Sequence, residues 1–363
     1  MKIHSSFTLL LVFFISLFCL FLFQITRKRT PLPCYVQMVA ASKQMQIALK
    51  EIGDYRMELN IPINPSLDPF QTGLIGDEIT PLTTTLGNLE AKQTALNPDF
   101  AALILRWLWE LDIQIGETLG LQLSGSFPSL NIAAIIACDV MQLNPIISSS
   151  IGSSSFGANL PEFTYLDMEK RLYEEGVIQH CSSIVTPGGN NDDKILLWEN
   201  SDSLIDKVIE RTGYPLLHPS TLDDAIQKKW QLFHSAGIVK GFINVGGNHS
   251  SIGNCSHSAT FPMGLVRKMQ ACQDPNRGLL MYFFEQRKPV IHLLNIRSLA
   301  IQANLPLTPN LSDSAGNSDI YFKVSQPLWI NMTLVILMLF SWLLLRSPYR
   351  IPRSCSTTST KVR

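Results

Sequence analysis

Three stretches of small, polar residues each follow a short apolar segment that is typical of a buried strand. They are residues 124–131, 148–155 and 244–251, which read Ser-Gly-Ser-Phe-Pro-Ser-Leu-Asn, Ser-Ser-Ser-Ile-Gly-Ser-Ser-Ser and Asn-Val-Gly-Gly-Asn-His-Ser-Ser. Small residues let backbone N–H groups approach a ligand closely, and a turn that opens onto a helix N-terminus favours an anion or a carboxylate. In an open parallel sheet, ligands bind beyond the carboxyl ends of the strands. The sequence therefore predicts a ligand crevice, and its expected binding residues are Ser124, Gly125, Ser126, Ser149, Ser150, Gly246 and Gly247.

Ser126 is a candidate nucleophile because it lies on the predicted strand-to-helix turn, with His249 or His292 as the base. The surrounding Gly-Ser-Phe-Pro lacks the Gly-x-Ser-x-Gly pattern that exposes the hydroxyl in many hydrolases. Capping of the next helix by the same hydroxyl is the favoured interpretation. The catalytic residues are therefore unknown from the sequence, with Ser126 and His292 as the candidates.

No nucleotide or metal signature accompanies these stretches. The chain contains neither Gly-x-Gly-x-x-Gly nor Gly-x-x-x-x-Gly-Lys-Ser/Thr, so ATP or NAD binding is not supported. His249 and His257 flank Cys255 in a predicted loop, where solvated side chains are the favoured interpretation over a zinc site. The sequence predicts no cofactor and no metal.

The spacing of apolar residues predicts alternating helices and strands. Helices are expected at residues 36–59, 98–108, 128–141, 165–175, 201–211, 222–236 and 279–287, and strands at residues 118–123, 145–149, 181–185, 241–245 and 290–294. Short buried strands separated by helices indicate a parallel sheet that is covered on both faces. The expected fold class is α/β, with a mostly parallel, doubly wound sheet flanked by helices.

Charge is unevenly distributed along the chain. All 29 Asp and Glu lie within residues 31–327, which hold only 20 of the 29 Lys and Arg. A nucleic-acid partner is not expected, because phosphate contacts need a surplus of basic residues. Residues 31–327 are predicted to form one acidic α/β domain, with the Pro- and Gly-rich residues 61–96 packed on it.

Both ends of the chain are apolar. Residues 7–23 and 328–345 are each nearly long enough, as helices, to cross a hydrocarbon core of about 30 Å. The sequence thus predicts an N-terminal transmembrane anchor or signal at residues 1–30, a C-terminal transmembrane helix at residues 328–345 and a basic tail at residues 346–363. By the positive-inside rule, the expected protein is a bitopic or two-pass protein of the cell membrane, in contact with membrane lipid, with its main domain outside the cytoplasm.

Cysteines and acidic residues have less informative positions. The seven cysteines show no Cys-x-x-Cys pair and no regular framework, so buried apolar thiols are expected. Asp167 and Glu169 are expected in the first turns of a helix, where carboxylates complement the helix dipole.

Several blocks of the chain resemble, in order, the bacterial poly-gamma-glutamate system proteins. The blocks are residues 72–76, 83–92, 97–102, 124–128, 159–167, 244–247 and 290–296, and the resemblance covers most of residues 35–325. It implies a membrane-attached bacterial protein that helps to make or export poly-gamma-glutamate as a capsule or released polymer. Subunits of the polymer synthase or exporter are the implied partners, and no catalytic residue is implied.

Two classes of function stay open. The first is an accessory component of poly-gamma-glutamate biosynthesis or export. The alternative is a hydrolase or gamma-glutamyl transferase that trims or releases the polymer through the crevice. An acidic domain repels a polyanion, with a Debye length of about 8 Å at physiological salt, so a crevice that grips one chain end is favoured over an extended polymer-binding surface.

Overall fold

The computed structural model describes residues 2–26, 28–193, 195, 201–235, 237–311, 314–325 and 327–346. The chain divides into two compact units. The terminal unit joins Met1–Pro31 to Phe322–Arg363, and the central unit is Leu32–Tyr321.

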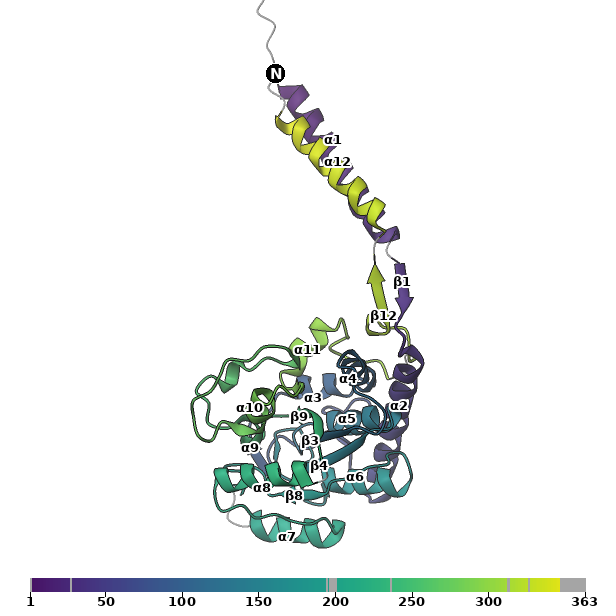
Figure 1. Cartoon of the computed structure of the whole chain (residues 1–363). Coiled ribbons are helices and arrows are strands. Elements are labelled where there is room, and N and C mark those ends of the chain that lie inside the picture. The colour runs from purple at the N-terminus through teal and green to yellow at the C-terminus, as the bar shows by residue number, and fades with distance from the viewer. Residues whose placement is uncertain are drawn as a thin grey trace, which may run out of the picture. The chain divides into compact units, whose positions relative to one another are not determined.

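A six-stranded mixed sheet forms the middle of the central unit (Figure 1). In spatial order its strands are β10 (Gly264–Val266), β11 (Val290–Leu293), β9 (Val239–Val245), β3 (Thr118–Ser124), β4 (Asn144–Ser150) and β8 (Ile184–Thr186). Neighbouring strands are parallel except at one edge, where β10 runs antiparallel to β11. The α/β class is confirmed. The antiparallel edge was not predicted, because three residues are too few to show a period of two.

The helices cover both faces of this sheet. On one face α5 (Pro128–Val140) packs with α2 (Tyr35–Glu58) and α4 (Asp99–Glu110), and on the other lie α8 (Leu222–Ser235) and α10 (Gly278–Glu285). A right-handed crossover places its helix on one face when the chain moves across the sheet in one direction, and on the other face when it moves in the opposite direction. The chain moves in opposite directions across the sheet from β3 to β4 and from β9 to β11, so the helices of these two connections lie on opposite faces. The shorter helices are α3 (Leu89–Ala95), α6 (Tyr165–Glu174), α7 (Ser201–Thr212), α9 (His249–Ile252) and α11 (Ile296–Gln302), with 3₁₀ turns η1 (Ser258–Thr260) and η2 (Asp319–Tyr321).

The strand order defines where a ligand crevice forms. From β3 the chain adds β4 and β8 on one side, and then β9 and β11 on the other, so the order reverses between β3 and β9. Loops leave this switch point in opposite directions, which opens a crevice at the carboxyl ends of the two strands.

The Pro- and Gly-rich segment packs on the central unit. Leu74, Ile75 and Leu82 are buried, and the segment includes β2 (Thr83–Thr85), which pairs in parallel with β5 (Ser153–Ser154). A second small pair joins β6 (Asn159–Leu160) to β7 (Phe163–Thr164). The segment is thereby joined to the loop that follows β4.

The terminal unit corrects the membrane prediction. It contains α1 (Lys2–Ile25), α12 (Leu328–Arg346) and an antiparallel pair of β1 (Lys28–Pro31) and β12 (Phe322–Ser325). Among the residues that the structure describes, no helix has both the length and the apolar character that a membrane crossing requires. The predictions of transmembrane helices at both ends and of a bitopic or two-pass cell-membrane protein are therefore wrong.

Apolar composition alone does not distinguish a transmembrane helix from helices that pack against each other. In the terminal unit Cys19 is buried with Ile330 and Leu334. The tail beyond Arg346 lies outside the described residues.

A disulfide joins Cys255 to Cys272, 17 residues apart. The prediction of buried thiols agrees with Cys34 and Cys138, whereas the Cys181 thiol is only half-buried. For the bonded pair the prediction of free thiols is wrong. The bond joins two loop positions with no short motif, so their proximity depends on the tertiary fold.

Packing between the sheet and α8 and α10 is tight and aromatic. The ring of Phe283 is fully buried and stacks on Phe242 with 4.4 Å between centroids.

We expect Phe283→Ala to lower the free energy of unfolding by about 3–5 kcal/mol, because it leaves a cavity in this core. Urea denaturation measures the change. Ile301→Ala, at a 57% exposed position on α11, is the matched control and should change the value by about 0.5 kcal/mol or less. A loss below about 1 kcal/mol in Phe283→Ala would contradict this packing.

Candidate functional site

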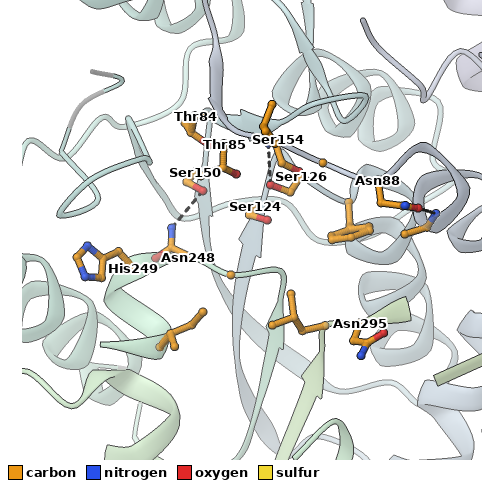
Figure 2. Close-up of a pocket in the computed structure, with 18 of the residues that line it drawn as sticks. Thr84, Thr85, Asn88, Ser124, Ser126, Ser150, Ser154, Asn248, His249 and Asn295 are labelled. Carbon is orange, nitrogen blue, oxygen red and sulfur yellow. Dashed lines mark hydrogen bonds between the residues drawn. The ribbon is translucent and has the colours of Figure 1, made fainter. Parts of the chain in front are cut away.

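A cavity of about 830 Å³ opens at the carboxyl ends of β3, β4 and β9. All three stretches of small, polar residues line it, through Ser124 and Ser126, through Ser150, Gly152 and Ser154, and through Gly247, Asn248 and His249. Figure 2 shows Ser124 at the tip of β3, with Ser126 and Ser154 close together on one side and Ser150 and Asn248 on the other. Further wall residues come from β2, α3, the loop after β8, α9 and the start of α11.

The predicted binding residues divide into two groups. Ser124, Ser126, Ser150 and Gly247 line the cavity, whereas Gly125, Ser149 and Gly246 do not. The Ser149 hydroxyl lies 2.6 Å from that of Ser182, because successive residues of β4 point to opposite faces of the sheet. Ligand binding by any of these residues stays a prediction.

Gly125 and Gly246 have a steric role beside the cavity. A Cβ at Gly246 would collide with the Ser124 hydroxyl, and the backbone there has φ +85°. A Cβ at Gly125 would lie 2.5 Å from the carbonyl oxygen of Ile151. The two glycines thus let the loops pass close to one another, so that their neighbours reach the cavity.

Ser126 does not cap α5. The N-cap residue of this helix is Phe127, whose side chain forms no capping hydrogen bond. Instead, Ser126 Oγ accepts the backbone N–H of Ser154 at 3.0 Å. The helix-capping interpretation is wrong, and the hydroxyl connects the first polar stretch to the second.

The candidate base His292 is not near Ser126 in the cavity. It is fully buried on β11, does not line the cavity, and its Nδ1 lies 3.0 Å from Nδ2 of Asn244. Burial lowers the pKa of His292 to about 4, so the ring is neutral. The other candidate base, His249, lines the cavity, but its Nδ1 accepts the N–H of Asn191 and its Nε2 lies 2.8 Å from Asn254 Oδ1. Neither histidine is placed to activate Ser126.

His292 belongs to a row of buried polar side chains across the sheet. Ser148, Gln122, Asn244 and His292 occupy matching positions on β4, β3, β9 and β11. All four are fully buried, and each keeps one polar side-chain atom without a hydrogen-bond partner among the described residues. Buried polar groups of this kind commonly bind internal water.

Lys92 is a cavity residue that the sequence analysis did not identify. Its side chain is 4% exposed, lines the cavity, and carries its ammonium 3.8 Å from the centroid of the Phe127 ring. Lys92 Nζ donates to the carbonyl oxygen of Ser126 and lies 2.7 Å from Ser154 Oγ. Among the described residues no carboxylate forms an ion pair with it, and burial lowers the pKa of Lys92 to about 7.

Local sequence explains the helix that carries Lys92. Asn88 caps α3 by accepting the N–H of Ala91 at 2.8 Å, and Glu90 lies in the first turn. The Asn88 cap was a readable signal for a helix. Burial of Lys92 was not readable, because lysine is almost never fully buried without a partner and its contacts come from residues far along the chain.

A buried ion pair connects the loops behind the cavity wall. Lys229 of α8 contacts Asp192, and both side chains are fully buried. Asp192 also accepts hydrogen bonds from Thr186, Asn248 and Ser250 at 2.8–2.9 Å. Asn248 in turn donates to Ser150 Oγ at 3.2 Å, as the dashed line in Figure 2 shows. The pair therefore joins the second and third polar stretches. Burial lowers the pKa of Lys229, and the Asp192 carboxylate opposes this shift.

A second cation lies in the wall of the cavity. Arg297 of α11 is 60% exposed and lies 3.3 Å from the Glu90 carboxylate, which is itself 46% exposed. An exposed pair at this distance contributes little stability and can exchange partners. Among the described residues that line it, the cavity thus has two basic side chains, a permanently charged Arg297 and a partly protonated Lys92, against one carboxylate, although the surrounding domain is acidic.

The carboxylates expected at a helix start have structural roles away from the cavity. Asp167 forms a capping box with Thr164 at the start of α6 and binds Arg211. Glu169 is fully buried and accepts hydrogen bonds from Tyr165 and Ser182, and burial raises its pKa. The prediction that these carboxylates interact with the helix dipole agrees with the position of Asp167. It did not include the full burial of Glu169.

Comparisons of the chain with protein-family models, with curated proteins and with solved structures give no match. The resemblance to poly-gamma-glutamate system proteins therefore stays a prediction.

The lowered pKa of Lys92 makes stability depend on pH. Between about pH 7 and the ordinary lysine value of 10.5, the unfolded chain binds a proton at Lys92 that the folded chain does not bind. The free energy of unfolding therefore rises with pH in this window. We expect the wild-type protein to gain on the order of 4 kcal/mol relative to Lys92→Met between these limits.

Urea denaturation at several pH values measures the difference. Lys50→Met removes a lysine whose side chain is 80% exposed and should show no such gain. A pH-independent difference between wild type and Lys92→Met would contradict a buried, unpaired Lys92.

Proposed function

We propose that the central unit binds the carboxylate-bearing end of a gamma-glutamyl chain in the cavity, and that the protein thereby serves as an accessory component of poly-gamma-glutamate biosynthesis or export. The observation that carries this proposal is the gathering of Lys92 and Arg297 in one cavity of an otherwise acidic domain. The resemblance in sequence supports the choice of polymer.

The cavity suits the chemistry of a gamma-glutamyl unit. Each such unit carries a free carboxylate beside a backbone amide. Arg297 offers a planar fork of donors that matches a carboxylate. Hydroxyl and amide side chains of Thr84, Ser124, Asn88 and Asn295 line the same space and can pair with the amide group.

Charge favours a chain end over a long bound segment. Residues 31–327 hold 29 acidic against 20 basic residues, so the outer surface repels a polyanion. The cavity that holds Lys92 and Arg297 is open to solvent on one side, and it is large enough to accept the end of a chain. The acidic outer surface repels the polymer, and the basic side chains of the cavity attract its carboxylates. Together these two effects favour binding of the terminal units of the polymer.

Arg297 provides the test. We expect Arg297→Ala to weaken binding of a short gamma-glutamyl peptide roughly tenfold, because one charge-assisted pair contributes about 1–2 kcal/mol. Isothermal titration calorimetry at low salt measures the dissociation constant. Glu90→Gln should strengthen binding, since it removes the carboxylate that competes for Arg297.

Arg267→Ala is the matched control, because Arg267 is 70% exposed, contacts Glu110 and does not line the cavity. Equal affinity in Arg297→Ala and Arg267→Ala would refute the proposed site. An alpha-linked glutamyl peptide of the same length and charge separates recognition of the gamma linkage from charge alone.

A further inference from the structure

We propose that Ser154 and Lys92 form a nucleophile and general-base pair that cleaves an amide or ester bound in the cavity. The pair gives the protein an acyl-transfer activity in addition to binding. The gamma-glutamyl identity of the amide rests on the function proposed above, whereas the pair itself rests on its own geometry.

The two reactive atoms are in hydrogen-bond contact. Lys92 Nζ lies 2.7 Å from Ser154 Oγ, and both residues line the cavity. Ser154 is 8% exposed and Lys92 is 4% exposed, so the contact lies at the inner wall, where a bound ligand excludes water. A hydroxyl within reach of an amine base is the arrangement that serine–lysine hydrolases use in place of a histidine.

The surroundings of Lys92 favour its neutral form. Burial lowers its pKa to about 7, and no carboxylate among the described residues holds its proton. Among the described residues, the charged and titratable groups that share the cavity wall with it are Glu90, His249 and Arg297. In the structure Lys92 Nζ donates both to the Ser126 carbonyl oxygen and to Ser154 Oγ. Once it is neutral, the amine can keep the first of these bonds and accept the hydrogen of the Ser154 hydroxyl instead.

Backbone pairing holds Ser154 in place. β5 pairs with β2, where Ser154 is matched with Thr85, and the Ser154 N–H donates to Ser126 Oγ at 3.0 Å. Ser126, the candidate nucleophile from the sequence, is therefore a positioning residue whose hydroxyl and carbonyl oxygens contact Ser154 and Lys92 respectively. Its own hydroxyl hydrogen has no acceptor among the described residues and can be donated into the cavity.

The reaction balances with water as the only co-substrate. Ser154 Oγ forms a bond to the carbonyl carbon and its proton passes to Lys92 Nζ. The carbon–nitrogen bond breaks, and the Lys92 ammonium returns the proton to the leaving amine. A water molecule then attacks the acyl carbon and gives a proton to Lys92, which passes it to Ser154 Oγ as the ester bond breaks and the carboxylic acid leaves.

A serine-reactive fluorophosphonate tests the pair without any assumed substrate. We expect the full chain to be labelled at Ser154, as mapped by peptide mass spectrometry, with a labelling rate that rises between pH 6 and pH 8 through a midpoint of about 7. Ser154→Ala should abolish labelling, and Lys92→Met should slow it by at least about 100-fold because the base is lost.

Ser155→Ala is the matched control. Its hydroxyl lies one residue away and does not line the cavity, so labelling should match that of the wild-type protein. Circular dichroism and thermal unfolding of every variant separate loss of the base from loss of the fold. Should Lys92→Met fail to fold, the pH profile of the wild-type protein still tests the base. Labelling that survives in Ser154→Ala, or a rate without a midpoint near pH 7, overturns the pair.

Incubation with poly-gamma-glutamate separates this inference from the proposed function. Shortening of the polymer by the wild-type protein and not by Ser154→Ala supports both. Binding of the gamma-glutamyl peptide without labelling or shortening overturns the catalytic pair and leaves the proposed function standing. Labelling of Ser154 without binding of the peptide supports the pair and overturns the proposed substrate.

Discussion

Desolvation of one amine, that of Lys92, governs the chemistry available in the cavity. A cation buried without a counterion loses hydration that the protein does not replace, and the group responds by giving up its proton near neutral pH. The Phe127 ring and the Ser126 carbonyl offset part of that loss. The amine therefore stands between two states, a cation that attracts a carboxylate and a base that can accept a proton from Ser154.

The rest of the central unit maintains that environment. The reversal of strand order between β3 and β9 opens the crevice, and Gly125 and Gly246 let the three loops approach closely. The Lys229–Asp192 pair differs from Lys92, because its buried charge has a partner and several hydrogen bonds. Loss of one member would leave an uncompensated buried charge, which typically costs about 3–5 kcal/mol. Lys229 thus has a structural role in the central unit, whereas the amine of Lys92 is free to lose its proton near neutral pH.

Much of the fold was predictable because its signals are local. Buried parallel strands appear as short apolar runs, and the Ser- and Gly-rich stretches mark where those runs end, so the loops that meet at the cavity could be named in advance. The distinction between Ser149 and Ser150 was also available, since alternate residues of a strand face opposite sides. Burial of Lys92 was not predictable, because it depends on contacts with Phe127 and Ser154, which lie 35 and 62 positions further along the chain. The Cys255–Cys272 bond and the edge strand β10 depend on tertiary structure in the same way. The apolar ends were misjudged because composition does not reveal what a helix packs against.

The protonation state of Lys92 can be measured directly. In protein labelled with ¹³C-lysine, the Lys92 Cε resonance is assigned by its absence from the Lys92→Met spectrum and then followed by NMR as the pH is raised. The structure predicts a titration midpoint of about 7. A midpoint near the ordinary lysine value of 10.5 would mean that the amine is hydrated or paired, and both the environment described for the cavity and the proposed base would be incorrect.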